Sequence, residues 1–233
     1  MTLVDDSPGS RTRRAGAWGL VFVVLLLIGA GMATVPGGDD PVGKVRRFYQ
    51  AHASVVLLSQ CVELVATVPL VLFLSGVAAS TLVRSRRGAL VAGGALVGAS
   101  LLTLVPPLLL VWMHDRASAS EVRTLAVLSD LSDVLLFAAI AGFAVVCCWA
   151  GEGPVWLRWL GLVVAVAAVL RAVEIVLGGG LPAVLAPLGF IVLVVALSVL
   201  LLRRAAVAGD RAPGNVNRER RARSRRGGGA ARR

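Results

Sequence analysis

Six long apolar runs, separated by short polar segments, set the pattern of the sequence. A helix needs about 20 apolar residues to cross a bilayer core of roughly 30 Å. Because backbone groups in lipid must find their hydrogen-bond partners inside the segment, each run is expected to form a helix. The sequence therefore predicts an all-α, polytopic transmembrane bundle of about six spans. The runs are 17–35, a part of 53–83, a part of 88–113, 125–150, 156–177 and 183–202.

The polar segments at the two ends divide the chain into three parts. Residues 1–16 form a short N-terminal segment, 17–202 hold the six spans, and 203–233 form an Arg-rich tail. The tail has no aromatic residue and little apolar content, so we expect it to be disordered. Prolines inside the spans remove a backbone donor and are expected to kink or locally break the helices. They are Pro69, Pro106, Pro107 and Pro187.

The composition excludes several classes of protein. Hydrophobic residues make up 57% of the chain and charged residues only 16%, whereas a soluble domain keeps roughly a quarter of its residues charged. An ordinary soluble protein, a disordered chain and a disulfide-rich secreted scaffold are therefore excluded. The richness in Ala, Val and Gly, with Arg in place of Lys at all basic positions except Lys44, indicates a GC-rich bacterial genome. We expect a multi-pass protein of the inner, or plasma, membrane.

Positive charge gathers in the tail and predicts the orientation. The formal net charge is +11, of which the tail carries +9. If the N-terminus lies inside, the inner segments hold 18 basic residues and the outer segments hold 5; without the tail the difference is 7 against 5. The positive-inside rule then predicts that both termini lie in the cytoplasm. The alternative is that the first run is a cleaved signal peptide, which would leave five spans.

The arginines of the tail predict contact with anionic lipid headgroups, because they follow the last span closely. A solvated segment that only fixes the topology is the alternative. Nucleic acid is not expected as a partner, since nothing in the tail supplies base stacking. The tail residues that would meet headgroups are Arg218, Arg220, Arg221, Arg223, Arg225 and Arg226.

Small residues on the third run predict a close helix–helix contact. Gly94 and Gly98 form a GxxxG spacing, which Ala89 and Gly93 extend. Such a stripe lets two helices approach closely. Packing inside the bundle is favoured over a dimer interface, and a homo-oligomer is left open.

Polar and ionisable residues inside the apolar runs are the strongest functional signal. They form three pairs spaced i,i+3, so that each pair shares one helix face. With a rise of about 1.5 Å per residue, all of them fall in the outer half of the bilayer. The sequence predicts a polar cluster between the second, fourth and fifth spans. Its members are Gln60, Glu63, Asp130, Asp133, Arg171 and Glu174.

The predicted cluster carries four carboxylates and one guanidinium, a formal sum of −3. Unpaired charge inside a membrane is costly, so neutralisation, contact with water or additional cations are required. Basic residues in the first outer loop, Lys44, Arg46 and Arg47, are candidates to dip into the cluster. Three readings stay open: a structural pair between Arg171 and an Asp of the fourth span, a proton or cation pathway, and a ligand-binding vestibule.

Sequence signals for an enzyme are absent. The chain contains no nucleotide-binding loop, HExxH, GxSxG or CxxC motif, and its three cysteines have no metal-ligand spacing. Cys61, Cys147 and Cys148 are expected to act as small apolar side chains. We therefore expect no enzymatic activity, no cofactor and no metal.

Short motifs give the chain a resemblance to a known family. They are 48–52 (FYQAH), 128–131 (LSDL) and 156–161 (WLRWLG), each at the start of a predicted span. The layout is similar to a family of uncharacterised bacterial six-span membrane proteins, over about residues 17–202. The resemblance implies a six-helix fold and brings no activity.

Three functions remain open from the sequence. The leading hypothesis is an integral membrane protein whose charged outer-leaflet cluster is structural or binds a small ligand. The second is a proton- or cation-coupled transporter or channel, with Glu63, Asp130 and Asp133 as carriers and Arg171 as the counter-charge. The third is a membrane adaptor that acts through its basic tail.

Overall fold

A computed structural model describes residues 8–32, 35–37, 40–113, 115–149, 153–177 and 184–210 of the 233-residue chain. These residues form six α-helices and, within the described ranges, no strand. Each helix is long and apolar enough to cross a membrane. The predicted all-α, six-span fold is thus confirmed. The helices are α1 (Pro8–Met32), α2 (Val42–Ala79), α3 (Arg86–Met113), α4 (Ala119–Trp149), α5 (Val155–Leu177) and α6 (Leu185–Asp210).

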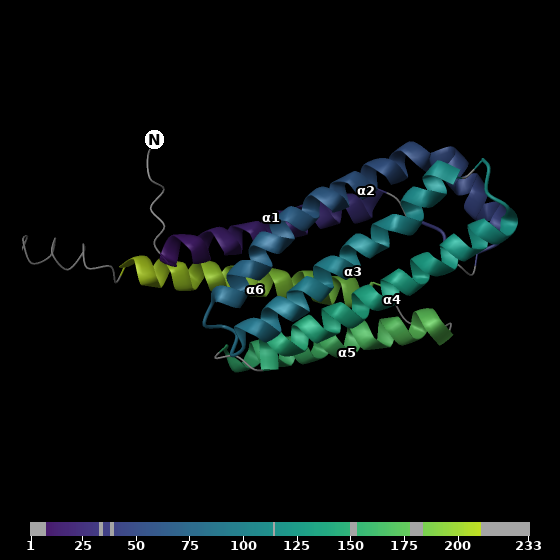
Figure 1. Ribbon diagram of the computed structural model, residues 1–233. Coiled ribbons are helices and arrows are strands. Elements are labelled where there is room, and N and C mark those ends of the chain that lie inside the picture. Colours follow the sequence, from purple (N-terminus) through teal and green to yellow (C-terminus); the bar gives the residue numbers. More distant parts are fainter. Residues whose placement is uncertain are drawn as a thin grey trace, which may run out of the picture.

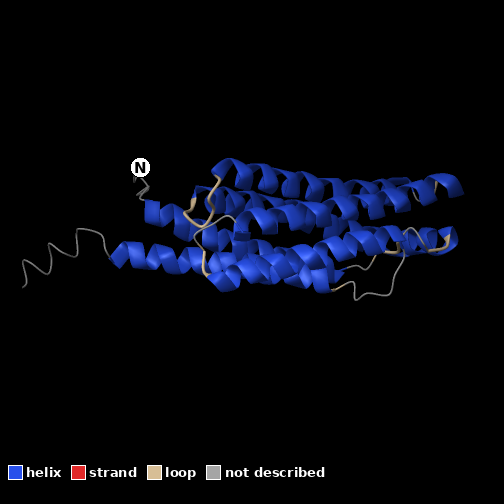
Figure 2. Ribbon diagram, turned by 90° about the horizontal axis from the view of Figure 1, so that it is seen from below, coloured by secondary structure: helices blue, strands red, loops and turns tan. Residues whose placement is uncertain are grey.

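The six helices form a closed ring. Each packs against the next in sequence, and α1 packs against α6. Figure 1 and Figure 2 show the helices running side by side, with the start of α1 and the end of α6 at one end of the bundle. We call this the terminal end and the opposite one the distal end. Across the middle of the ring α2, α4 and α6 also touch, and without α1 the ring would be open.

The outside of the ring is apolar. Large side chains such as Val65, Val91 and Val163 are exposed, at 58%, 73% and 62%. Soluble proteins rarely present continuous apolar surface of this kind. Together with the length of the helices, this surface identifies a multi-pass integral membrane protein.

Helix α2 begins at Val42, well before the expected start of the second span. Its first turns bury Val45 and Tyr49 against a second core, to which Leu110, Ala117 and Val122 belong. At about 1.5 Å per residue its 38 residues measure about 57 Å, more than the roughly 30 Å of a bilayer core. A non-helical backbone at His52 (φ −126°, ψ 16°) separates the early turns from the span. The part of the expected outer loop from 42 to 52 is therefore helix.

The other end of the chain also differs from expectation. Helix α6 continues to Asp210 and so includes 203–210, which were expected to belong to a disordered tail. Arg204 donates a hydrogen bond of 2.7 Å to Thr81, just after α2, and this contact ties the end of α6 to the bundle. The predicted lipid-binding arginines lie outside the described residues; they are Arg218, Arg220, Arg221, Arg223, Arg225 and Arg226.

The prolines do not break the helices. Helix α2 continues through Pro69, and α3 continues through Pro106 and Pro107. Pro187 lies in the first turn of α6, where no intrahelical partner is required for its nitrogen. The expected local breaks are therefore not found, and the only non-helical backbone noted inside α2 is at His52.

Close packing at the terminal end depends on small residues. A Cβ at Gly19 of α1 would overlap the Ser198 hydroxyl of α6 and the Phe73 ring of α2. A Cβ at Gly76 of α2 would overlap the Ala15 methyl of α1. Since these helices approach too closely for a larger side chain, glycine is required by space at both positions.

The small residues of α3 do not all face the same way. A Cβ at Gly93 would meet the Leu74 side chain of α2 at 3.4 Å, which is ordinary contact, whereas Gly94 and Gly98 have nothing within 4 Å. Gly93 thus packs inside the ring and the GxxxG pair faces outward.

Candidate functional site

The middle of α2 holds Glu63 against α1. The Ser59 hydroxyl donates a hydrogen bond of 2.9 Å to the Gly29 carbonyl, and a Glu63 carboxylate oxygen lies 3.4 Å from the same hydroxyl. A Cβ at Gly29 would lie only 2.9 Å from Cγ of Glu63. The glycine therefore leaves the room in which the Glu63 side chain turns inward. Gln60, one turn away, is 7% exposed.

Asp133 of α4 lies within electrostatic reach of charged side chains on α2 and α5 as well as on its own helix. This carboxylate on α4 interacts with Asp130 on its own helix, with Arg171 of α5 and with Glu63 of α2. The connection after α1 passes close by, because a Cβ at Gly37 would lie 3.6 Å from a carboxylate oxygen of Asp130. Asp130 thus lies close to Gly37 of this connection, whereas Glu63 lines a pocket in the ring.

Arg171 has its ion pair on its own helix. It contacts Glu174 at 2.8 Å in an i,i+3 pair, with side-chain exposures of 27% and 7%. The structural reading of the sequence placed an Asp of α4 in this role. Asp133 feels the Arg171 charge, but the close contact goes to Glu174, since the two share one face of α5.

The three basic residues near the start of α2 find other partners than the intramembrane carboxylates. Lys44 forms a surface ion pair of 2.7 Å with Asp40. Arg46 donates to the Ala117 carbonyl, in the turn before α4, and Arg47 donates to the Gly43 carbonyl at 3.1 Å. These contacts hold the distal end together and do not support the idea that the basic residues dip into the acidic cluster.

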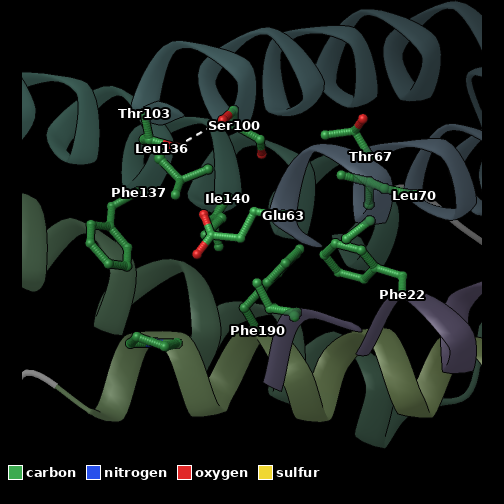
Figure 3. A pocket seen from close by; sticks show the side chains of 13 residues that line it. Phe22, Glu63, Thr67, Leu70, Ser100, Thr103, Leu136, Phe137, Ile140 and Phe190 are labelled. Carbon is green, nitrogen blue, oxygen red and sulfur yellow. Dashed lines mark hydrogen bonds between the residues drawn. The ribbon is translucent and has the colours of Figure 1, made fainter. Parts of the chain in front are cut away.

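A cavity of about 140 Å³ lies inside the ring, lined by side chains of α1, α2, α3, α4 and α6. Figure 3 shows the Glu63 carboxylate pointing into it among Phe137, Ile140 and Phe190. Nine of the thirteen lining residues are apolar. The remaining four are Glu63, Thr67, Ser100 and Thr103.

The three hydroxyls of the cavity donate their protons to their own helices. Thr67 bonds to the Leu64 carbonyl at 2.6 Å, and Ser100 to the Leu96 carbonyl at 2.8 Å. Thr103 bonds to the Ser100 carbonyl at 2.8 Å. Sequence reasoning did not select these residues, because a Ser or Thr satisfied by its own backbone is common in helices. A hydroxyl that donates in this way still has lone pairs to offer as an acceptor.

The terminal half of the bundle is filled. Beyond the cavity, Phe73 of α2, Phe143 of α4 and Leu197 of α6 are at most 1% exposed. Gly19 brings α1 into close contact at the same level. Interiors packed this way hold few voids as large as a water molecule, so the polar side of the interior belongs to the distal half.

Cysteines and metal ligands add nothing to the site. Cys61 is exposed, and Cys147 and Cys148 are buried and free; Cys148 packs against Gly161 of α5. In the part of the chain that the structure describes, no group of three His, Cys, Asp or Glu side chains is placed to hold a metal ion.

Comparisons with family models, curated proteins and solved structures find no match to this chain. The likeness to a six-span bacterial family stays a prediction from the three short motifs.

Proposed function

We propose that this membrane protein binds a small cation inside the distal half of its helical ring. The observation that carries the proposal is the position of Glu63, whose carboxylate lines the central cavity and interacts electrostatically with Asp133. Arg171 is already paired with Glu174, so its charge is shared. A bound cation would offset the acidic charge that remains, which is costly inside a membrane.

The orientation follows from the positive-inside rule. We propose that both termini lie in the cytoplasm and that the protein sits in the plasma membrane of a bacterium. The distal end then faces outward. The Arg-rich tail lies at the cytoplasmic surface, where it contacts anionic headgroups.

Cation-coupled transport is the second candidate. It is favoured by the three carboxylates, since Asp130 lies near Gly37 of the α1–α2 connection, Asp130 and Glu63 both act electrostatically on Asp133, and Glu63 lines the cavity. The filled terminal half, with Phe73 and Phe143 fully buried, offers no continuation of the path in this conformation. Transport would therefore need a rearrangement of the helices, whereas binding needs none.

The test of binding is cation-dependent thermal stabilisation of the purified protein. A ligand that binds only the folded state raises the melting temperature with its concentration. We expect at least one monovalent cation, inorganic or organic, to raise the melting temperature saturably, and Glu63→Gln to abolish this effect. Failure of every cation in the panel to stabilise the wild-type protein would contradict the proposal.

Glu121→Gln is the matched control. It removes one carboxylate at the exposed start of α4, where Glu121 accepts hydrogen bonds from the backbone and side chain of Ser118. Glutamine also suits this capping box. The control should keep the cation response of the wild-type protein.

A further inference from the structure

The size of the central cavity limits its occupant. Its volume is about 140 Å³, and an apolar cavity of about 150 Å³ in another protein holds a benzene molecule. An occupant of about five to eight non-hydrogen atoms therefore fits, judged by that comparison.

The polar atoms of the cavity are acceptors. Thr67, Ser100 and Thr103 each donate their hydroxyl proton to a backbone carbonyl of their own helix. Their lone pairs remain, and when Glu63 is ionised its carboxylate is likewise an acceptor without a proton to give. An anion would then find no hydrogen-bond donor among these four side chains. A ligand with N–H groups has protons to donate to them.

The rest of the wall suits a carbon skeleton. Phe22, Phe137 and Phe190 come from three different helices, and the rings of Phe22 and Phe190 pack edge to face with centroids 6.2 Å apart. Aromatic faces attract ammonium groups as well as alkyl groups. A hard metal cation prefers six or more oxygen ligands, and the lining with nine apolar residues of thirteen does not supply them.

We infer that the cavity binds a small alkylammonium ion that carries at least one N–H group, with the nitrogen at Glu63 and the carbon chain among the phenylalanines (Figure 3). This inference rests on the proposed cation-binding function and specifies the class of ligand. A charge-assisted hydrogen bond from the ammonium to Glu63 supplies the binding energy that a neutral ligand would lack.

The test compares four probes by melting temperature and by calorimetric titration of the detergent-purified full chain. The probes are n-butylammonium chloride, 1-butanol, tetramethylammonium chloride and sodium chloride, with ionic strength held constant. We expect saturable binding of n-butylammonium and weaker or undetectable binding of the other three. Glu63→Gln should weaken n-butylammonium binding by about tenfold or more, since it removes the charged acceptor, while Glu121→Gln should leave the affinity unchanged.

The opposing outcomes separate the two proposals. Saturable stabilisation by sodium that equals that of n-butylammonium, and that is lost in Glu63→Gln, would overturn the alkylammonium inference and leave cation binding intact. Equal binding of 1-butanol and n-butylammonium would overturn it as well, because charge would then play no part. Tetramethylammonium binding as tightly as n-butylammonium would refute the N–H requirement. If none of the four probes binds or raises the melting temperature, both proposals are contradicted.

A second variant keeps the test valid if Glu63→Gln does not fold. Thr103→Val preserves the shape of the side chain and removes one acceptor of the cavity wall. We expect a smaller loss of n-butylammonium affinity than in Glu63→Gln, with 1-butanol binding unchanged. An unchanged n-butylammonium affinity in Thr103→Val would argue against the acceptor-lined site.

Discussion

Gly29 of α1 and Glu63 of α2 lie so close together that a single added methyl group would disturb them. A Cβ at Gly29 would stand 2.9 Å from Cγ of Glu63. The contact sets the position of the carboxylate at the cavity and connects the packing of two helices to the proposed chemistry. We therefore expect Gly29→Ala to displace the Glu63 side chain and to weaken cation binding, measured by calorimetric titration.

The same helix provides the control for this substitution. Gly31 has nothing within 4 Å of an added Cβ, so Gly31→Ala should keep the affinity of the wild-type protein. Overpacking of a core costs typically about 1–3 kcal/mol, and Gly29→Ala should lose stability at the low end of this range because Glu63 can turn aside. Equal cation affinities in both variants would contradict the role given to Gly29.

Close packing at the terminal end predicts a larger loss of stability. Gly19→Ala or Gly76→Ala would force apart α1 and its neighbours, α6 and α2, because an added methyl overlaps Ser198 and Phe73, or Ala15. The expected cost is about 2–3 kcal/mol, at the upper end of typical overpacking. Unfolding in a denaturing detergent, followed by circular dichroism, measures the difference.

Gly94→Ala and Gly98→Ala are the matched controls on α3. Neither position has an atom within 4 Å of an added Cβ. Alanine is favoured over glycine inside a helix by up to about 1 kcal/mol, so both variants should be as stable as the wild-type protein or more stable. Destabilisation at these two positions would show that they pack against something, such as a second copy of the chain.

The hydrogen bonds of Ser118 at the start of α4 predict that replacing this residue lowers the stability of the protein. Ser118 and Glu121 form a reciprocal capping box. The Ser118 backbone N–H donates to the Glu121 carboxylate at 2.7 Å, and the Glu121 backbone N–H donates to the Ser118 hydroxyl at 3.3 Å. Ser118→Ala should destabilise the protein by about 1 kcal/mol, the usual cost of removing such a cap. Chemical denaturation can measure this change, and an unaltered midpoint would show that the cap contributes nothing.

The pairing of Arg171 predicts which double-mutant cycle shows coupling. Because Arg171 contacts Glu174 at 2.8 Å, the cycle of Arg171→Ala with Glu174→Ala should give an interaction energy near the average of about 0.6 kcal/mol for polar pairs in membranes, or above it. The cycle of Arg171→Ala with Asp133→Ala should give less, since no close contact joins the two. A stronger coupling to Asp133 would restore the structural pairing expected from the sequence.

The fold was largely predictable because the membrane requires long apolar helices, and hydropathy reports them directly. The early start of α2 was not, since 42–52 contains three basic residues and gains its stability from contacts of Val45 and Tyr49 with α3 and α4. Local hydropathy does not include such contacts. The continuation of α6 through Arg204 escaped prediction for the same reason.

The candidate site was predictable in part. The rise per residue placed Glu63, Asp133 and Arg171 at a similar depth, and in the structure the charges of Glu63 and Arg171 both act on Asp133; the cluster itself stays a prediction. The sequence could not select the partner of Arg171, because i,i+3 and interhelical partners were both available. Nor could the sequence predict the cavity. Thr67 of α2 lines the same cavity as Ser100 and Thr103 of α3 only because these helices pack together in the fold.

The most direct test of the account asks whether a cation occupies the space beside Glu63. An apolar carbodiimide enters the membrane and modifies carboxyl groups there, and mass spectrometry of the digested protein identifies the modified residue. The account predicts modification of Glu63 that falls severalfold in the presence of saturating n-butylammonium, with 1-butanol giving no protection. Modification of Glu63 that proceeds equally with and without every cation would contradict the central claim.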